Sequence, residues 1–485
     1  MSELILFWHR RDLRLSDNIG LAAASQQSQK VVGVFCLDRN ILERDDIAPA
    51  RATYMIGCLQ QLQQRYAEAG SQLLILQDTP SKAIPTLAAA LNAKAVFWNW
   101  DVEPYSKERD KRVTEALNEK GIRVQNFWDQ MLHSPEEIRA GKGQPYTVYT
   151  PFWKNWNSKP KAEPVAALQN TLSLTESEQE AARAAGAIVL PTPKELGFNW
   201  ENELIIAPGE TAARARLEEF CSNAIYAYRE QRNFPAVDGT SRLSAALKFG
   251  AIGIRTVWAA TTAAWEQTRS TETQEGIRTW QQELAWREFY QHAMYHFPEL
   301  AVGAYREVFK NFPWENNKEH FQAWCEGKTG YPIVDAAMRQ MNKIGWMHNR
   351  CRMIVASFLT KDLLISPQLG EKYFMQKLID GDLSANNGGW QWSASSGMDS
   401  KPIRIFNPAS QSLKFDSEGE YIRQWIPELR SVDTEFLVSG IIPASERDGL
   451  GYPAPIVDHK QQQRQFKERY QVQKESPPII EDCYR

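Results

Sequence analysis

Cysteine and histidine are scarce in this chain, with six cysteines and seven histidines among 485 residues. The cysteines are scattered, and none lies in a Cys-x-x-Cys pair or at metal-ligand spacing from a histidine. This pattern argues against a zinc site and against a disulfide framework, and it favours reduced thiols. We therefore expect no bound metal and a cytoplasmic protein.

Long apolar runs are missing as well. No segment approaches the roughly 20 apolar residues of a membrane-spanning helix. The N-terminus, Met1–Asp12, lacks the basic lead, apolar core and cleavage site of a signal peptide. The Gly-x-Gly-x-x-Gly fingerprint of dinucleotide-binding folds is also absent after the first apolar run. These absences disfavour a membrane protein and a nicotinamide-dependent oxidoreductase.

The overall composition is that of a globular protein, with 43% hydrophobic and 24% charged residues. The length is sufficient for two or more domains. The net charge of −3 argues against bulk attraction to nucleic acid, but it is compatible with a local basic groove. The unusual feature is the 17 tryptophans, whose placement beside polar residues matters more than their number.

Residues 1–130 alternate between short apolar runs and helical patterns such as 50–69 and 107–120. The apolar runs are Leu4–Trp8, Val31–Leu37, Ser71–Gln77, Ala93–Trp98 and Ile122–Phe127. We predict a Rossmann-like α/β domain, in which a parallel sheet has helices on both faces. Ligands of such sheets bind beyond the carboxyl ends of the strands. Those ends carry residues 9–11, 38–39 and 101–103.

The rest of the chain divides into three parts. Residues 131–203 are rich in proline and form a predicted linker, with a short helix near Glu176–Ala185. Residues 204–475 have helical periodicity and form a predicted all-α domain, and residues 476–485 form a predicted flexible tail. The helical patterns cover residues 211–229, 241–249, 253–265, 274–295, 332–344 and 347–364.

The segment Trp280–Tyr290 places aromatic and charged side chains at helical spacing. Steps of three and four residues bring them to one helix face. They are Trp280, Glu283, Trp286, Arg287 and Tyr290. Such a face can be a cavity wall, where aromatics stack on a planar ligand and the carboxylate accepts from its edge. The alternative is an amphipathic core stripe with a Glu283–Arg287 pair.

A second helical face lies in Gly345–Met353, where Asn349, Arg352 and Met353 fall together. An arginine flanked by asparagine can bind phosphates or the polar edge of a flavin. The alternative is a helix start with exposed basic residues. His348 by itself is typical of a structural histidine.

The segment Asp380–Trp392 is the most informative. It contains two carboxylates, two amides and three glycines, with Trp390 and Trp392 just beyond them. Glycine permits close backbone approach, while aspartate and asparagine supply converging polar groups. We interpret the segment as part of a ligand site, with a purely structural loop as the alternative.

A fourth cluster lies upstream and contains Tyr228, Arg232 and the segment Thr240–Ser244. Hydroxyls at a helix start, together with free backbone N–H groups and the positive end of the dipole, favour an anion such as a pyrophosphate. Simple N-capping by Thr240 or Ser241 is the alternative.

These four segments, in this order and spacing, resemble the DNA photolyase and cryptochrome family. The resemblance also includes Phe7–Asp17, Asn233–Pro235 and Arg404–Pro408, and it covers nearly the whole chain. It implies an α/β antenna domain, a long linker and a helical FAD domain. It further implies a monomeric class I photolyase for cyclobutane pyrimidine dimers. In such enzymes, blue light drives an electron from reduced FAD into a flipped-out dimer.

The resemblance also implies which residues hold FAD. Asn386 would face N5 of the isoalloxazine and stabilise the reduced or semiquinone flavin. The implied FAD-binding residues are Tyr228, Thr240, Ser241, Arg242, Leu243, Ser244, Trp280, Arg287, Arg352, Asp380, Gly381, Asp382 and Asn386.

For the DNA, the resemblance implies that Glu283 hydrogen-bonds a dimer base and that Asn349 supports the base or the ribityl side. Trp286, Met353 and Trp392 would form apolar walls, because a flipped base must be stacked in a dry pocket. The implied DNA contacts are Arg232, Trp286, Arg287, Trp346, Met347, Arg350 and Lys401. Trp346–Arg350 matches the dimer-type pattern and lacks the paired histidines of (6-4) enzymes.

An antenna chromophore is implied as well. A deazaflavin pocket is suggested by Phe35, Cys36, Leu37, Asp38, Arg51, Asp101, Glu103 and Lys248. Relatives that bind a folate carry a Cys-Lys pair where this chain reads Glu299–Val302. We therefore expect 8-hydroxy-5-deazaflavin, with methenyltetrahydrofolate as the alternative.

One departure from the family concerns electron transfer. Relatives reduce the flavin through three tryptophans, and Trp390 and Trp314 match the inner and outer ones. The middle position is occupied by Pro367, preceded by Ser366, which suits a helix start. We predict slow or absent photoreduction of oxidised FAD, with repair intact once the flavin is chemically reduced.

Three other functions are open to the sequence alone. A cryptochrome would share the fold and flavin but would signal instead of repairing. A light-independent flavoprotein oxidoreductase would need a nicotinamide site. A simple nucleic-acid-binding module is disfavoured, because the polar cluster at 380–387 exceeds what phosphate binding needs.

Overall fold

The computed structural model describes residues 3–398 and 403–475. The chain divides into two compact units. The first contains residues 3–230, 239–298 and 379–382, and the second contains the other described residues. The division does not coincide with the predicted domain boundary at 203/204, because the first helices of the predicted helical domain belong to the same unit as the sheet.

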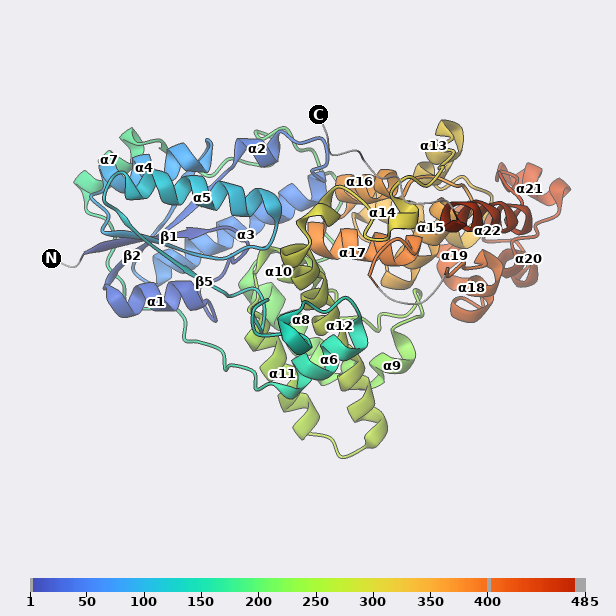
Figure 1. The fold of residues 1–485 in the computed structure, drawn as a ribbon, viewed down its shortest axis with the longest axis horizontal. Helices are drawn as coiled ribbons and strands as arrows, with labels where there is room; N and C mark the ends of the chain where they lie inside the picture. Colours follow the sequence, from blue (N-terminus) through green and yellow to red (C-terminus); the bar gives the residue numbers. More distant parts are fainter. Residues whose placement is uncertain (1–2, 399–402, 476–485) are drawn as a thin grey trace. The chain divides into compact units, whose positions relative to one another are not determined.

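The first unit contains the predicted parallel sheet (Figure 1). The strand order is β5-β4-β1-β2-β3-β6, and all pairings are parallel except that of β6 with β3. The strands are β1 Leu4–His9, β2 Lys30–Cys36, β3 Leu73–Leu76, β4 Ala95–Asn99, β5 Arg123–Phe127 and β6 Ala187–Ile188. The first five confirm the predicted apolar runs, whereas β6 is too short to leave a pattern.

The strand order reverses at β1, which pairs with β2 on one side and with β4 on the other. Phe7 is in register with both Gly33 and Phe97. The carboxyl ends of β1 and β4 therefore flank a topological switch point, which is the usual ligand position in open α/β sheets. Residues Arg10 and Arg11 follow β1 at this point.

Helices cover both faces of the sheet (Figure 1). Their bounds are α1 Ile19–Gln27, α2 Arg39–Leu42, α3 Pro49–Glu68, α4 Pro80–Ala90 and α5 Pro104–Asn118. Every residue of β1 is buried, as expected of a strand covered on both sides. Close packing requires Gly33, because a Cβ there would lie 2.5 Å from the Tyr66 ring of α3.

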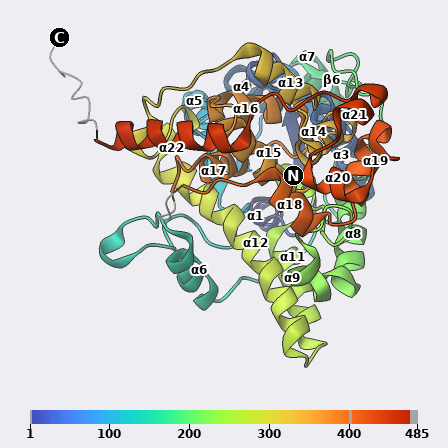
Figure 2. The same cartoon turned by 90° about the vertical axis from the view of Figure 1, so that its right-hand side faces the viewer.

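The linker is more structured than its sequence suggested. It contains α6 Tyr149–Ser158, which was not predicted, and α7 Glu176–Ala184, which was. The remaining helices of the first unit are α8 Glu210–Ser222, α9 Tyr228–Gln231, α10 Ser244–Phe249, α11 Ile254–Glu266 and α12 Thr271–His296. The predicted continuous helix over 211–229 is wrong, because non-helical backbone at Asn223 interrupts it. Helices α11 and α12 run next to each other (Figure 2).

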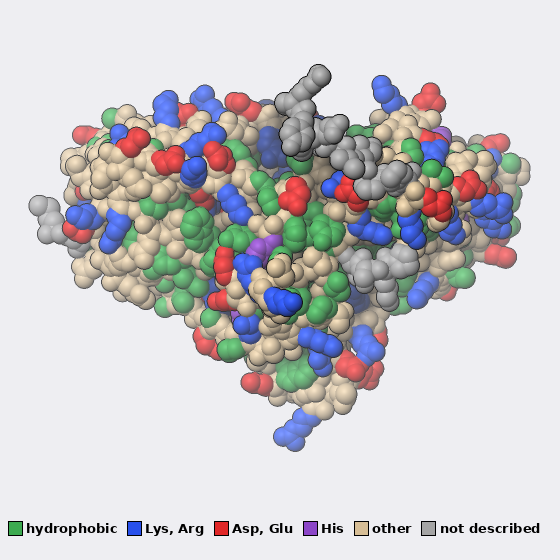
Figure 3. Space-filling view, in the orientation of Figure 1, with side chains coloured by type: hydrophobic (Ala, Val, Ile, Leu, Met, Phe, Trp, Pro, Cys, Tyr) green, Lys and Arg blue, Asp and Glu red, His purple; other side chains and the backbone are tan. Residues whose placement is uncertain are grey.

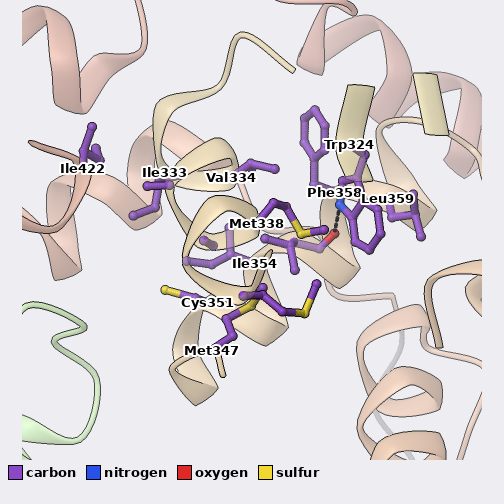
Figure 4. Close-up of a cluster of buried hydrophobic side chains, with 14 of the residues drawn as sticks. Trp324, Ile333, Val334, Met338, Met347, Cys351, Ile354, Phe358, Leu359 and Ile422 are labelled. Carbon is purple, nitrogen blue, oxygen red and sulfur yellow. Dashed lines mark hydrogen bonds between the residues drawn. The ribbon is translucent and has the colours of Figure 1, made fainter. Parts of the chain in front are cut away.

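The second unit is helical. Its helices are α13 Lys318–Glu326, α14 Pro332–Ile344, α15 Asn349–Lys361, α16 Pro367–Lys377, α17 Leu383–Ala394, α18 Pro408–Phe415, α19 Glu420–Trp425, α20 Thr434–Ser439, α21 Ala444–Leu450 and α22 His459–Glu475. Its core packs α13, α14 and α15 together (Figure 4). Within this core, Trp324 Nε1 donates to the Val355 carbonyl at 3.1 Å. None of the helices in the described part of the chain is long and apolar enough to span a membrane.

Candidate active site

Helix α12 presents the predicted stripe of side chains to solvent within the first unit. Glu283, Trp286, Arg287 and Tyr290 are half-buried, while the neighbouring residues 284, 285, 288 and 289 are buried. Trp280 differs, because it is 3% exposed and packs on Phe220 with ring centroids 5.3 Å apart. The alternative of a core stripe thus applies to Trp280 but not to the other four residues.

Backbone carbonyls hold Arg287 in place. Its guanidinium donates to the carbonyl of Gln130 at 2.8 Å and to that of Leu247 at 3.3 Å. Burial lowers the pKa of Arg287, and the carboxylate of Asp382 acts in the opposite sense. A fixed guanidinium of this kind suits a planar, polar ligand.

The hydroxyl-rich segment 240–244 is a turn and not the expected helix start. Helix α10 begins only at Ser244, with Leu243 as N-cap and no side-chain cap. The helix predicted over 241–249 therefore begins three residues later, and the alternative of N-capping by Thr240 or Ser241 is wrong. Arg242 takes a positive φ of 53°, which reverses the chain before the helix.

Arg216 of α8 fixes this turn, a role that the sequence did not indicate. It donates to the carbonyls of Thr240 at 2.7 Å and of Ser241 at 3.0 Å. Since both carbonyls are bound from one side, the turn is held in a single conformation. Leu243 as a whole residue is only 1% exposed, so it offers almost no surface to a ligand.

A buried charge cluster occupies the switch point between β1 and β4. Arg11 donates to Glu103 at 2.7 Å, contacts Asp101 at 3.4 Å and forms an ion pair with Asp382. Burial disfavours the charge of Asp101, but Arg11 outweighs it and holds the pKa of Asp101 below its usual value. Burial raises the pKa of Glu103. The sequence indicated Asp382 as a cofactor residue but not its pairing with Arg11.

Two further cations belong to this cluster. Arg51 donates to the carbonyl of Gly381 at 3.4 Å and to that of Asp46 at 2.7 Å, and burial lowers its pKa to about 10. Burial also lowers the pKa of Lys248 to about 8, while Glu103 acts in the opposite sense. The expected antenna residues Arg51, Glu103 and Lys248 thus lie together, beside the backbone of 381–382.

The other expected antenna residues lie at the end of β2 and directly after it. Phe35, Cys36 and Leu37 are buried, and the Cys36 thiol donates to the Asp78 carbonyl at 3.2 Å. Asp38 caps α2 and accepts from the Tyr105 hydroxyl at 2.6 Å. Tyr105 was not predicted, because its contact with Asp38 joins residues from different strand–helix crossovers.

In the second unit, α15 begins at Asn349, two residues after the predicted start at 347, and His348 is its N-cap. Asn349 is exposed, and its Nδ2 lies 3.8 Å from Sδ of Met353. Arg352 donates from Nε to the Met347 carbonyl at 2.9 Å. The first turn of α15 therefore presents an amide, a thioether and a guanidinium within one unit.

The residues expected to contact DNA differ in how deeply they are buried and in which groups they contact. Arg350 donates to Asn233 Oδ1 at 2.6 Å and lies over the Phe415 ring at 4.4 Å. Arg232 is half-buried. The expectation for Met347 is wrong, because its side chain is fully buried in the core of the unit (Figure 4).

Trp346 is 8% exposed, which limits it to contact through an edge. Lys401 lies outside the described residues. On the face drawn in Figure 3, lysine and arginine side chains are interspersed with acidic ones. This mixture agrees with the small net charge of −3.

Helix α17 carries the second half of the segment 380–392. Asn386 Nδ2 donates to the Glu371 carbonyl at 3.0 Å, which directs Oδ1 of this amide away from α16 as an acceptor. Trp392 is half-buried beneath the Arg404 guanidinium, 4.4 Å from its ring. Within the described chain, Ser384 Oγ and Trp390 Nε1 are buried without a protein hydrogen-bond partner. Such unsatisfied polar atoms fit a polar ligand beside α17.

Trp390 and Trp314, the two tryptophans expected to carry electrons, have different aromatic neighbours. Trp390 is 2% exposed and contacts Phe374 at 4.9 Å between ring centroids. Trp314 lies in a separate aromatic cluster, 4.4 Å from Phe312. Helix α16 begins at Pro367 with Ser366 as N-cap, as predicted.

The start of α16 is joined to the segment that carries Trp314. Ser366 N donates to Asn316 Oδ1 at 2.8 Å, and Glu315 N donates to the Leu364 carbonyl at 2.7 Å. One turn beyond Pro367, Gly370 contacts the Trp390 ring. Pro367 therefore occupies the region between the two tryptophans.

No cluster of three or more metal-ligating side chains is found among residues 3–398 and 403–475. Within the first unit, α12 and the switch point carry polar and aromatic groups, among them a carboxylate, Glu283, suited to hydrogen-bonding the edge of a base. Within the second unit, α15 and α17 carry a further set of polar and aromatic groups.

Comparison with known proteins agrees with this chemistry. Residues 5–169 match the DNA photolyase family, and residues 280–472 match the FAD binding domain of DNA photolyase. A deoxyribodipyrimidine photo-lyase of Synechococcus sp. (strain ATCC 27144 / PCC 6301 / SAUG 1402/1) is 60% identical over 471 residues, which are 97% of both chains.

Two solved structures are similar over almost the whole chain. A bacterial class III photolyase from Agrobacterium tumefaciens is 33% identical, with a TM-score of 0.88 and 98% of both chains covered. The cryptochrome of Synechocystis sp. PCC6803 is 27% identical, with a TM-score of 0.86, and the match covers 96% of this chain and 99% of that one. With the relative that is 60% identical, these matches show that the chain belongs to the DNA photolyase and cryptochrome family.

Proposed function

We propose that this chain is a deoxyribodipyrimidine photo-lyase, which splits cyclobutane pyrimidine dimers in DNA under blue light with FAD as its cofactor. The observation that carries this function is the identity of 60% over 97% of the chain to a protein of that name. The half-buried stripe on α12 supports it, because an acid and an aromatic wall lie on one helix face.

The residues that would hold FAD, as the resemblance to the family implies, are Tyr228, the segment 240–244, Arg287, Arg352, Asp380, Asp382 and Asn386. When bound, reduced FAD supplies the electron that excitation by light releases. The Oδ1 of Asn386 would accept from the N–H that a reduced flavin carries at N5, which would favour the reduced state. Asn386 is suited to this role because its Nδ2 is occupied by the Glu371 carbonyl.

The lesion is bound by the remaining side chains. As the resemblance to the family implies, Glu283 would hydrogen-bond a pyrimidine base, and Asn349 would support the base or the ribityl side. Trp286, Met353 and Trp392 provide apolar surface, and each is partly accessible within its own unit. Apolar walls exclude water and compensate for the few kcal/mol, to order of magnitude, that flipping costs. Arg232 and Arg350 contact phosphates and position the strand.

The test is blue-light repair by the purified full chain. Protein with chemically reduced FAD is mixed with thymine-dimer DNA, and restored thymines are measured in light and in the dark. We expect repair in light only, and a strong loss of repair per absorbed photon in Glu283→Leu. Absence of repair by the wild type would favour a cryptochrome, which shares the fold but signals instead.

The antenna is a separate proposal. The switch-point cluster of Arg51, Glu103 and Lys248 supports 8-hydroxy-5-deazaflavin, with methenyltetrahydrofolate as the alternative. The absorption spectrum of the chromophore released from protein purified from its native cells distinguishes the two, because a deazaflavin absorbs at longer wavelength than a folate.

We further propose that the protein is a cytoplasmic monomer. Light scattering tests the oligomeric state, and cell fractionation tests the location.

A further inference from the structure

We propose that Tyr149, on the linker helix α6, is a positioning residue for the Trp286 ring. It backs one face of this ring so that the opposite face is fixed for stacking on a pyrimidine. This inference rests on the proposed function, because it assigns Trp286 to the wall of the lesion site. It adds a linker residue to a site whose expected members lie in the helical half of the chain.

The two rings form a close parallel stack. Their centroids are 3.6 Å apart and their planes differ by 7°. The Tyr149 hydroxyl donates to the Gln282 carbonyl at 2.8 Å, one turn before Trp286 on α12. Tyr149 therefore spans one turn of α12 and is fixed both through its ring and through its hydroxyl.

Helix α6 itself is firmly anchored to α12. Phe152 packs on Phe289 and His292, with ring centroids 5.3 and 5.1 Å apart. Trp156 Nε1 donates to the carboxylate of Glu288 at 2.6 Å, and both side chains are fully buried. Because Tyr149 is the first residue of this anchored helix, its ring is held by a rigid element.

The geometry of α12 determines which face of Trp286 is covered. At about 100° per residue, the positions that α6 contacts, Gln282, Phe289 and His292, lie within about 80° of each other. Glu283 and Arg287 lie about 100–140° from Gln282 in the other direction. Trp286 falls between the two groups. Tyr149 thus covers the ring from the α6 side, and the other face turns toward Glu283.

Backing of this kind improves binding by preorganisation. An unsupported tryptophan on a helix surface has several rotamers, and binding a base must select one of them. Aromatic pairs contribute enough to shift an equilibrium about two- to tenfold. The contribution is specific to a stacked lesion, since phosphate contacts do not involve this ring.

The test measures dark binding of flavin-loaded full-length variants to thymine-dimer DNA and to undamaged DNA of the same sequence. Tyr149→Leu keeps apolar volume but removes the ring, and Tyr149→Phe keeps the ring but removes the hydroxyl. We expect Kd for dimer DNA to rise about two- to tenfold in Tyr149→Leu. Undamaged DNA should bind as before, and Tyr149→Phe should stay near the wild type.

Tyr146→Leu is the matched control. This residue lies just before α6 and contacts Phe152 at 6.1 Å between ring centroids, so it reports general damage to the linker. A double-mutant cycle with Trp286→Leu gives a second measurement, in which Tyr149→Leu should have no further effect once Trp286 is gone. Melting temperatures of all variants exclude a loss of folding as the cause.

The two hypotheses fail in different ways. If the wild type does not prefer dimer DNA, the proposed function is wrong. If the wild type prefers dimer DNA and Tyr149→Leu retains that preference, the positioning role is wrong. Equal loss in Tyr149→Leu and Tyr146→Leu, or an additive effect of Tyr149→Leu with Trp286→Leu, would also overturn it.

Discussion

Gly370 of α16 lies directly against the Trp390 ring, so that a Cβ added at this glycine would overlap the indole. The same Cβ would also meet Leu359. Trp390 is thus packed between α16 and the core of its unit, next to the helix start at Pro367. A buried indole held this closely has one orientation available.

We predict that Gly370→Ala destabilises the protein by about 1–3 kcal/mol, the usual range for overpacking a core. Urea unfolding followed by tryptophan fluorescence measures the change. Gly449→Ala in α21 is the matched control, because nothing lies within 4 Å of its added Cβ. A helical glycine in open space should gain about 0.5–1 kcal/mol on change to alanine. Equal effects of the two variants would contradict the close contact at Gly370.

Pro367→Trp should accelerate the photoreduction of oxidised FAD by an external thiol, because it places an oxidisable ring between Trp390 and Trp314. Flavin absorbance under blue light measures the rate, and repair by chemically reduced protein should not change. Pro367→Phe is the control, since phenylalanine fills the position without being readily oxidised. Rapid wild-type photoreduction that is abolished by Trp314→Phe would mean that the gap is bridged, and our prediction would be wrong.

Rapid wild-type photoreduction that survives Trp314→Phe would point to another route. Trp324 is then the residue to replace, because its ring centroid lies 6.1 Å from that of Trp390.

Glu288 should make stability depend on pH. Burial raises the pKa of this carboxyl to about 7, from an ordinary value of 4.5. The folded state therefore holds the proton more tightly than the unfolded state, and stability falls as pH rises from 4.5 to 7 before levelling off. The loss is on the order of 3 kcal/mol. The free energies of unfolding of the wild type and of Glu288→Gln, measured between pH 4.5 and 7, give the size of this loss. If the two free energies change with pH in parallel, Glu288 does not cause the loss.

Lys361 should stabilise the end of α17. Its buried ammonium donates to the Ser393 carbonyl at 2.6 Å, to Ser395 Oγ at 3.1 Å and to the Arg404 carbonyl. Lys361→Met should cost about 1–3 kcal/mol, because these carbonyls lose their donor. Denaturant unfolding and faster amide exchange at Ser396 report the loss. As a comparison, Lys310 forms an exposed ion pair with Glu307, and Lys310→Met should change stability by less than about 1 kcal/mol.

Several features could be predicted because they depend on neighbours in the chain. The runs of apolar residues determined five strands, and alternation with helical patterns determined that the sheet is parallel. Ser366 and Pro367 determined where α16 begins. The three- and four-residue spacing of Glu283, Trp286 and Arg287 determined that they share an accessible face of α12.

Other features could not be predicted from the same patterns. Trp280 has the same helical spacing as Glu283, but it is buried by Phe220 of α8. Met347 lies two residues before the exposed Asn349, but its side chain belongs to the core. Periodicity shows which residues share a face and does not show what covers that face.

The sequence by itself determined the fold class and the family, and it predicted the residues of the site, because apolar periodicity and the local motifs are properties of short segments. Only the tertiary structure decided the partners of those residues. The ion pair between Arg11 and Asp382 and the stack of Tyr149 on Trp286 join segments far apart in the chain. Such partners depend on how whole helices and strands pack, and any one segment is compatible with many packings.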